Sequence, residues 1–249
     1  TEGNPQCRFG ITSRFTPGDA VRIDAITDDG QYHAWTEINV PQRPFEIENV
    51  DTVTVPLAQS GYTTEYLRYR ITINDRPNET NYYRIVIDKQ TTLWGYNHEE
   101  GGDDYIYWTK HSYNFIGRED VVLTDGQPTT GDDEDNGLFD TAKNIYGVFD
   151  DTRFRNTSYT MTVYNNTKIE TGSDSGYFSG MDVIIRLMSI TETEYYYLKA
   201  LNLVDSDAYD ETINEPIKYP SNVHGGTGMV GISTEVTQTI HIISSSHSK

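Results

Sequence analysis

The chain has 249 residues, of which 19 are Lys or Arg and 38 are Asp or Glu, so its net charge at pH 7 is −19. This charge argues strongly against a nucleic-acid-binding protein, which needs a basic surface, and disfavours docking on an anionic lipid face. Hydrophobic residues make up 35% of the chain, and 19 Tyr, 8 Phe and 3 Trp supply much of its apolar surface. Because Tyr and Trp favour strands, this composition predicts an aromatic-rich β protein.

The first ninety residues alternate apolar and polar side chains, as half-buried strands do. Strands are expected over residues 20–25, 32–40, 45–55, 66–74 and 82–88. Asp28-Asp29-Gly30 marks a hairpin turn after the first of them. This spacing predicts an immunoglobulin-like β-sandwich portion over residues 1–90, whose opening strands are expected in a segment before Thr1.

Residues 91–137 are rich in Gly, Asp and aromatic residues and have little periodicity. One strand is expected over residues 103–112, and Gly95 places Trp94 and Tyr96 in a loop. Long irregular segments in a compact domain are commonly functional or disordered. The irregular segment is therefore the first place to look for a binding site.

Residues 91–249 are predicted to form a second β-rich domain, with the boundary between the domains near residues 89–94. Strands are expected over residues 158–164, 181–190 and 240–243. Thr191 and Glu194 form a capping box that begins one helix over residues 191–205, with the Glu194 side chain reaching back to the helix start. The predicted fold class is mainly β, with a sandwich portion followed by a β-rich portion that carries one α-helix. No apolar run reaches about 18 residues, so no transmembrane segment is expected.

Aromatic residues gather in the irregular segment, and their flat rings lie close in sequence to Asp, Asn and Glu. They are Trp94, Tyr96, Tyr105, Tyr107, Trp108 and Tyr113. Surfaces of this type bind peptides, and ring faces also stack on the C–H faces of sugars. Packing of alternate rings against a sheet is the other explanation for each residue.

An acidic run has part of the spacing of a calcium-binding loop. Asp132, Glu134 and Asn136 occupy positions one, three and five, and Gly137 occupies position six. Position twelve is Lys143 rather than Glu, which excludes an EF-hand and leaves a looser calcium site or a solvated acidic loop. No other cofactor is expected. Cys7 is the only cysteine, which excludes an internal disulfide and a cysteine-based metal centre.

The sequence has no nucleophile elbow, zinc-protease motif or phosphate-binding loop. Residues 222–231 contain four glycines without a strand-to-helix context, which favours a bulge or a close backbone approach. A binding protein without catalytic activity is therefore expected. A glycoside hydrolase with a cryptic carboxylate pair stays open, because such pairs are defined by their separation in space.

The order of several segments resembles the Bacteroidota domain-of-unknown-function family four-two-four-nine. In the C-terminal third the segments are residues 144–151, 159–164 and 182–189, Tyr195-Tyr196-Tyr197-Leu198, Glu215-Pro216 and the glycine-rich residues 222–231. Toward the N-terminus they are Pro17-Gly18-Asp19 and residues 36–41, 47–51 and 75–84. The resemblance covers residues 17–243.

This resemblance implies a lipoprotein on the outer-membrane surface, encoded beside a TonB-dependent transporter. It implies an accessory or ligand-capturing subunit whose partner is that transporter, with a glycan or peptide as a further ligand, and it carries no catalytic residues. The residues before Cys7 form no lipobox, so the lipid anchor is expected in an N-terminal segment that is missing here. A free-standing carbohydrate-binding or adhesion protein is the alternative.

Overall fold

A computed structural model describes residues 12–59, 62–97, 101–111, 120–126, 143–166, 176–205 and 217–243. Within these residues the chain forms ten strands and one helix, which confirms the mainly β fold with a single helix. The elements are β1 (Ala20–Ile26), β2 (His33–Asn39), β3 (Asn49–Gln59), β4 (Tyr62–Asn74), β5 (Tyr82–Asn97), β6 (Gly101–His111), β7 (Val148–Asp150), β8 (Ser158–Asn166), β9 (Gly176–Ile190), α1 (Glu192–Asp205) and β10 (Thr234–Ile243).

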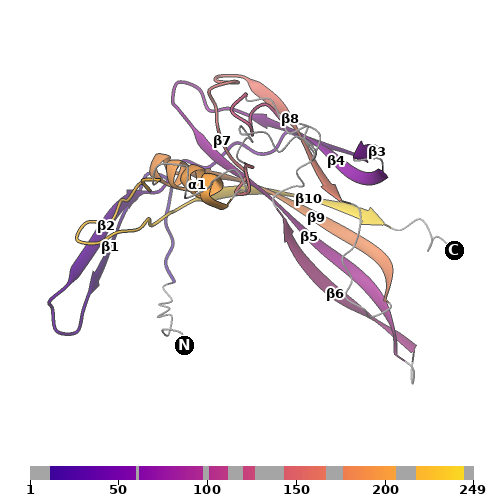
Figure 1. The fold of residues 1–249 in the computed structure, drawn as a ribbon, viewed down its shortest axis with the longest axis horizontal. Coiled ribbons are helices and arrows are strands. Elements are labelled where there is room, and N and C mark those ends of the chain that lie inside the picture. The colour runs from indigo at the N-terminus through magenta and orange to yellow at the C-terminus, as the bar shows by residue number, and fades with distance from the viewer. Residues whose placement is uncertain are drawn as a thin grey trace.

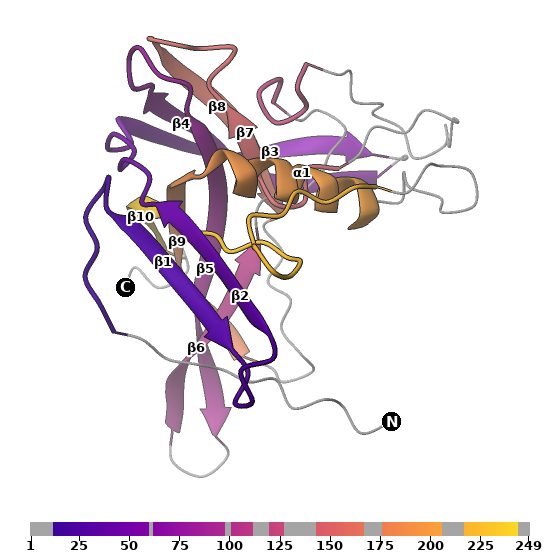
Figure 2. The same cartoon turned by 90° about the vertical axis from the view of Figure 1, so that its left-hand side faces the viewer.

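The strands form three antiparallel sheets (Figures 1 and 2). The first contains only β1 and β2, and the second has the order β3-β4-β8. The third and largest has the order β10-β9-β5-β6, with β7 paired to the first residues of β5. In Figure 1 the β1–β2 pair extends away from the two larger sheets, which meet in the upper right of the view.

The core lies between the two larger sheets and is made by alternate residues of their strands. The residues on this inner face include Tyr69, Ile71 and Ile73 of β4, Tyr83, Ile85 and Ile87 of β5, Met161 and Val163 of β8, and Val183, Ile185 and Leu187 of β9. Val122 and Leu123, from the turn at residues 120–126, are also buried in this core. The period-two pattern of the sequence therefore marks the inner face correctly.

Helix α1 packs on the opposite face of the largest sheet, where Tyr195 and Leu198 form a second cluster with Val148 and Ile190. The helix begins as the sequence predicts: the Glu194 N–H donates to Thr191 Oγ1 at 3.2 Å. The second hydrogen bond of a capping box, in which the Glu194 side chain would accept from the Thr191 backbone N–H, is not seen in the described residues. Glu194 Oε2 is buried and, within the described residues, has no hydrogen-bond partner.

Strand β5 runs through residues 89–94, where the sequence suggests a domain boundary. The first ninety residues contribute strands to all three sheets, and the core between the larger sheets combines residues from both sides of that boundary. Strand β7 has only three residues and was not predicted. Pairing with Tyr82, Tyr83 and Arg84 supports it.

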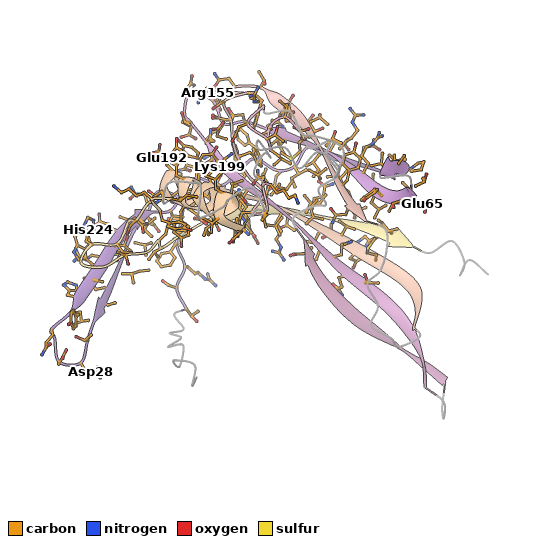
Figure 3. The ribbon with its side chains drawn as sticks, viewed as in Figure 1. Asp28, Glu65, Arg155, Glu192, Lys199 and His224 are labelled. Carbon is orange, nitrogen blue, oxygen red and sulfur yellow. The ribbon has the colours of Figure 1, made fainter. Side chains whose placement is uncertain are left out.

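A buried polar cluster joins the turn after β4 to the turn after β7. The Asn81 backbone N–H donates to Asp151 Oδ2 at 2.8 Å, and the Asn81 side chain reaches Asp75 Oδ1 at 3.2 Å. Tyr83 donates its hydroxyl to the same Asp75 oxygen, and Arg155 donates to Asp151 Oδ1 at 3.0 Å. Figure 3 places Arg155 at the upper edge of the molecule. These bonds satisfy two buried carboxylates and hold the two sheets together at this corner.

Candidate binding surfaces

The first candidate surface is the far end of the β5–β6 hairpin, called here the aromatic hairpin (residues 91–97 of β5 and 101–108 of β6). The backbone register pairs Trp94 with Asp104, Tyr96 with Gly102, and Leu93 with Tyr105. Thr91 pairs with Tyr107 and Gln90 with Trp108. Five of the six aromatic residues singled out in the sequence therefore belong to one strand pair.

The expectation of a loop at Trp94 and Tyr96 is wrong, because β5 continues through Gly95 to Asn97. The sequence hides this strand because Gly and polar residues interrupt its alternation. Pairing on both sides supports it instead: Trp94 lies opposite Asp104 of β6 and opposite Tyr177 of β9. Tyr113 and the calcium candidates Asp132, Glu134 and Asn136 lie outside the described residues.

A bulge shapes this end of the sheet. The register between β5 and β9 shifts between Thr92 and Leu93, which pair with Gly180 and Phe178. Such a shift increases the local twist and turns the strands that follow it. In Figure 1 the ends of β5 and β6 extend to the lower right, with β9 beside β5, beyond the strands of the β3-β4-β8 sheet. The aromatic hairpin thus projects from the body of the protein.

The second candidate surface is the β1–β2 pair, called here the N-terminal ribbon. Several large apolar side chains on it are exposed, among them Ile23 (42%), Ile26 (63%) and Tyr32 (71%). A two-stranded ribbon has little stability by itself, so contacts with the rest of the chain must hold it in place. Its exposed apolar residues make it a candidate for contact with another protein.

Residues from the two ends of the chain fix the ribbon. Trp35 and His224 exchange two backbone hydrogen bonds, of 2.9 and 2.8 Å, and their rings stack with centroids 4.1 Å apart. Arg22 also lies against the Trp35 ring, with its guanidinium carbon 4.3 Å from the ring centroid. Figure 3 shows His224 beside the ribbon and Asp28 at its tip. No motif in the sequence indicates this stack, although the alternation does place Trp35 on the face of the ribbon opposite Thr36.

The glycine-rich segment explains why His224 can come so close. Gly225 has φ +74°, and a Cβ at this position would lie 2.2 Å from the carbonyl oxygen of His33. Gly231 also lies close to a side chain, because a Cβ at this position would be 2.6 Å from Glu194 Oε2. The expectation of a close backbone approach within residues 222–231 is therefore confirmed.

The charges on the ribbon are paired. Arg22 Nε lies 2.9 Å from Asp24 Oδ2, and His33 Nε2 lies 2.8 Å from Asp24 Oδ1. The hydrogen bonds from Arg22, and then those from His33, lower the pKa of Asp24 from 3.8 to about 2. Asp24 is therefore ionised throughout the neutral range, with a basic side chain on each side.

In the body of the protein, the pKa of Glu194 is shifted in the opposite direction from that of Asp24. Burial raises the pKa of its carboxyl group, and the nearby positive charge of Arg84 opposes this only in part. Burial also raises the pKa of Tyr82, whose hydroxyl donates to Glu192 Oε1 at 3.0 Å. Both residues lie where α1 packs on the sheet.

Within the described ranges, no three His, Cys, Asp or Glu side chains come together as metal ligands would. The same part of the chain contains no helix with the length and apolar character needed to cross a bilayer.

A protein-family model described as "Domain of unknown function (DUF4249)" matches residues 2–239. No curated protein and no solved structure matches the chain. The family match spans both candidate surfaces and α1, so all of them lie within the region that defines the family.

Proposed function

Because the chain belongs to the DUF4249 family, whose function is unknown, we propose that it is a binding subunit without catalytic activity that captures a ligand for a larger assembly. The observation that carries this proposal is the aromatic hairpin. One projecting strand pair bears Trp94, Tyr96, Tyr105, Tyr107 and Trp108, with two aspartates beside them in the strands. Aromatic residues and aspartates at neighbouring register positions suit a glycan or a peptide.

The partner in this proposal is a TonB-dependent nutrient transporter, and the site of action is the outer-membrane surface. Support for both comes from the family resemblance, in which such proteins are lipid-anchored and encoded beside these transporters. The net charge of −19 agrees with a protein or glycan ligand rather than a polyanion. The aromatic hairpin would then contact the transporter or the ligand that the transporter takes up.

The test removes two rings from the aromatic hairpin. A Trp94→Ala/Trp108→Ala variant is expected to lose most of the transporter that co-purifies with the parent after gentle detergent extraction of native outer membranes. The matched control is Tyr196→Ala/Tyr219→Ala, which removes two exposed rings outside both candidate surfaces and is expected to retain the transporter. Circular dichroism checks that both variants fold.

Recovery of the parent alone, with no transporter, would contradict the accessory role. The same aromatic hairpin then favours the second candidate function, a free-standing carbohydrate-binding or adhesion protein. A glycan array probed with the purified protein tests that function directly, and the tryptophan variant should lose any signal that the tyrosine control keeps.

A further inference from the structure

The N-terminal ribbon has one strand edge that pairs with nothing in the described residues. Strand β2 lies between β1 on one side and His224 on the other, so it makes hydrogen bonds on both sides. Among the described residues, strand β1 pairs only with β2, and six of its seven residues are exposed. An exposed edge of this length is a template for a further strand.

The hydrogen bonds of the ribbon show which residues of β1 face outward. Thr27 N–H donates to Tyr32 O, and Val40 N–H donates to Asp19 O, so the odd-numbered residues bond toward β2. The N–H and C=O groups of Ala20, Arg22, Asp24 and Ile26 therefore point to the free edge. A new strand must bond to these four residues.

The sequence of this edge is complementary to itself. If a second β1 lies antiparallel with Ile23 opposite Ile23, Arg22 of each copy faces Asp24 of the other copy. On the opposite face, Val21 of each copy faces Ala25 of the other, so this face is apolar. Cross-strand pairs of opposite charge and apolar cross-strand pairs each stabilise a sheet.

The charges also select this register over its neighbours. A shift of two residues in one direction places Arg22 opposite Arg22, and a shift in the other direction places Asp24 opposite Asp24. Like charges directly opposite each other are destabilising. A shift of one residue would place each residue of one β1 whose N–H and C=O point to the free edge opposite a residue of the other β1 whose N–H and C=O point toward its own β2. Such residues cannot bond to each other. Charges often protect an edge strand from pairing, but here they favour one partner.

We propose that β1 is a homodimerisation edge, at which two copies of the chain join their ribbons into one four-stranded sheet with the order β2-β1-β1-β2. The contact is isologous, with the two-fold axis at Ile23. Ile23, which is 42% exposed, then packs against its own copy. This inference goes beyond the proposed function, since it uses the other projecting strand pair and needs neither transporter nor ligand.

Charge reversal tests the pairing in the purified full chain. Sedimentation equilibrium over a concentration series is expected to show a reversible dimer for the parent. Arg22→Asp and Asp24→Arg are each expected to weaken dimerisation by at least roughly tenfold, because each places like charges in both central pairs. Mixing the two variants should restore a dimer, since the two aspartates on the edge of one variant then face the two arginines on the edge of the other.

A disulfide at the two-fold axis is the second test, and it does not depend on charge. In a Cys7→Ser background, Ile23→Cys places two thiols at a non-hydrogen-bonded pair with a Cα separation of about 4.5 Å, which a disulfide can span. Oxidation is expected to give a covalent dimer. The Ala25→Cys control puts its thiols too far apart and should stay free of cross-links. Circular dichroism and melting curves check the fold of every variant.

Three results would overturn the proposal. They are a parent that is monomeric at all concentrations, single charge variants that dimerise like the parent, and an Ala25→Cys variant that cross-links as readily as the Ile23→Cys variant. Loss of the transporter in the membrane experiment leaves these results unaffected, so failure of the proposed function and failure of the dimer are separate outcomes.

Discussion

Strands β4 and β1 show the same alternation in sequence and occupy very different surroundings. In β4, Tyr69, Ile71 and Ile73 are at most 1% exposed, because the largest sheet covers them. In β1, Ile23 and Ile26 are 42% and 63% exposed. The period-two pattern identifies a strand in both cases.

The difference shows that the pattern does not say what covers the apolar face. In the body, cover comes from another sheet of the same chain, and burial there supplies stability at about 25 cal/mol per Å² of apolar surface. In the N-terminal ribbon the apolar residues stay near the surface, and the described residues leave the edge of β1 open. The same type of residue therefore serves stability in one region and is available for association in the other.

The largest expected effect separates the two regions directly. Ile71→Ala is expected to lower the free energy of unfolding by about 3–4 kcal/mol, because it opens a cavity at a fully buried position. Ile23→Ala on the ribbon should change it by less than about 0.5 kcal/mol at low protein concentration. Urea denaturation followed by circular dichroism measures both. Equal losses for the two variants would contradict the contrast between body and ribbon.

A second comparison concerns carboxylates. Asp151 is fully buried and accepts hydrogen bonds from Asn81 and Arg155, whereas Asp28 is exposed at the tip of the ribbon. Asp151→Ala is expected to cost about 3 kcal/mol, since it leaves buried donors without an acceptor. Asp28→Ala serves as the control and should be nearly neutral. A small effect at Asp151 would mean that the polar cluster does not tie the sheets together.

Much of the fold was predictable because its signals are local. The alternation in residues 66–74 predicted β4, and the Thr191 cap predicted the start of α1 within one residue. The mainly β class followed from the same alternation, whereas the family followed from the order of several segments along the chain, and the family model confirms it. These features depend on residues that are close in sequence, so a single sequence carries them.

The rest depended on pairing between distant segments. Strand β5 continues past Gly95 because β6 and β9 pair with it, and β7 exists because it pairs with Tyr82 and its neighbours. The stack of Trp35 on His224 joins the two ends of the chain. No local pattern reports such pairings. For the same reason, the sequence named the aromatic residues but could not place them on one projecting hairpin.

The joint between ribbon and body gives the third prediction. Gly225→Ala is expected to cost about 2 kcal/mol, because it combines a left-handed backbone with a clash against His33 O. Gly30→Ala is the matched control: φ is +68°, but no atom lies within 4 Å of its Cβ, so only the backbone cost of about 1 kcal/mol applies. The readout is hydrogen exchange at the Trp35 and His224 amides. Exchange should speed up about tenfold or more for Gly225→Ala, and unchanged exchange would contradict the proposed joint.

The smallest expected effect is on the pH dependence of stability, and it tests the burial of Glu194 in the body of the protein. The folded-state pKa of Glu194 lies above its unfolded value of about 4.3, so folding favours the protonated form of this carboxyl group. The stability that the protonated carboxyl group contributes is therefore fully present below the unfolded pKa, and it is lost as the pH rises through the folded pKa. Glu194→Gln removes this loss. It should raise the free energy of unfolding at pH 7 by at most about 1 kcal/mol, since solvent screens part of the effect, and by less near pH 4.

The nearby Glu192→Gln is the control of opposite sign. Glu192 is exposed at the helix N-terminus and accepts a hydrogen bond from the Tyr82 hydroxyl, so its negative charge is favourable there. Melting curves of both variants and the parent at pH 4 and pH 7 make the comparison. A Glu194→Gln variant that melts below the parent at pH 7 would show that the helix dipole and Arg84 outweigh burial at this carboxyl group.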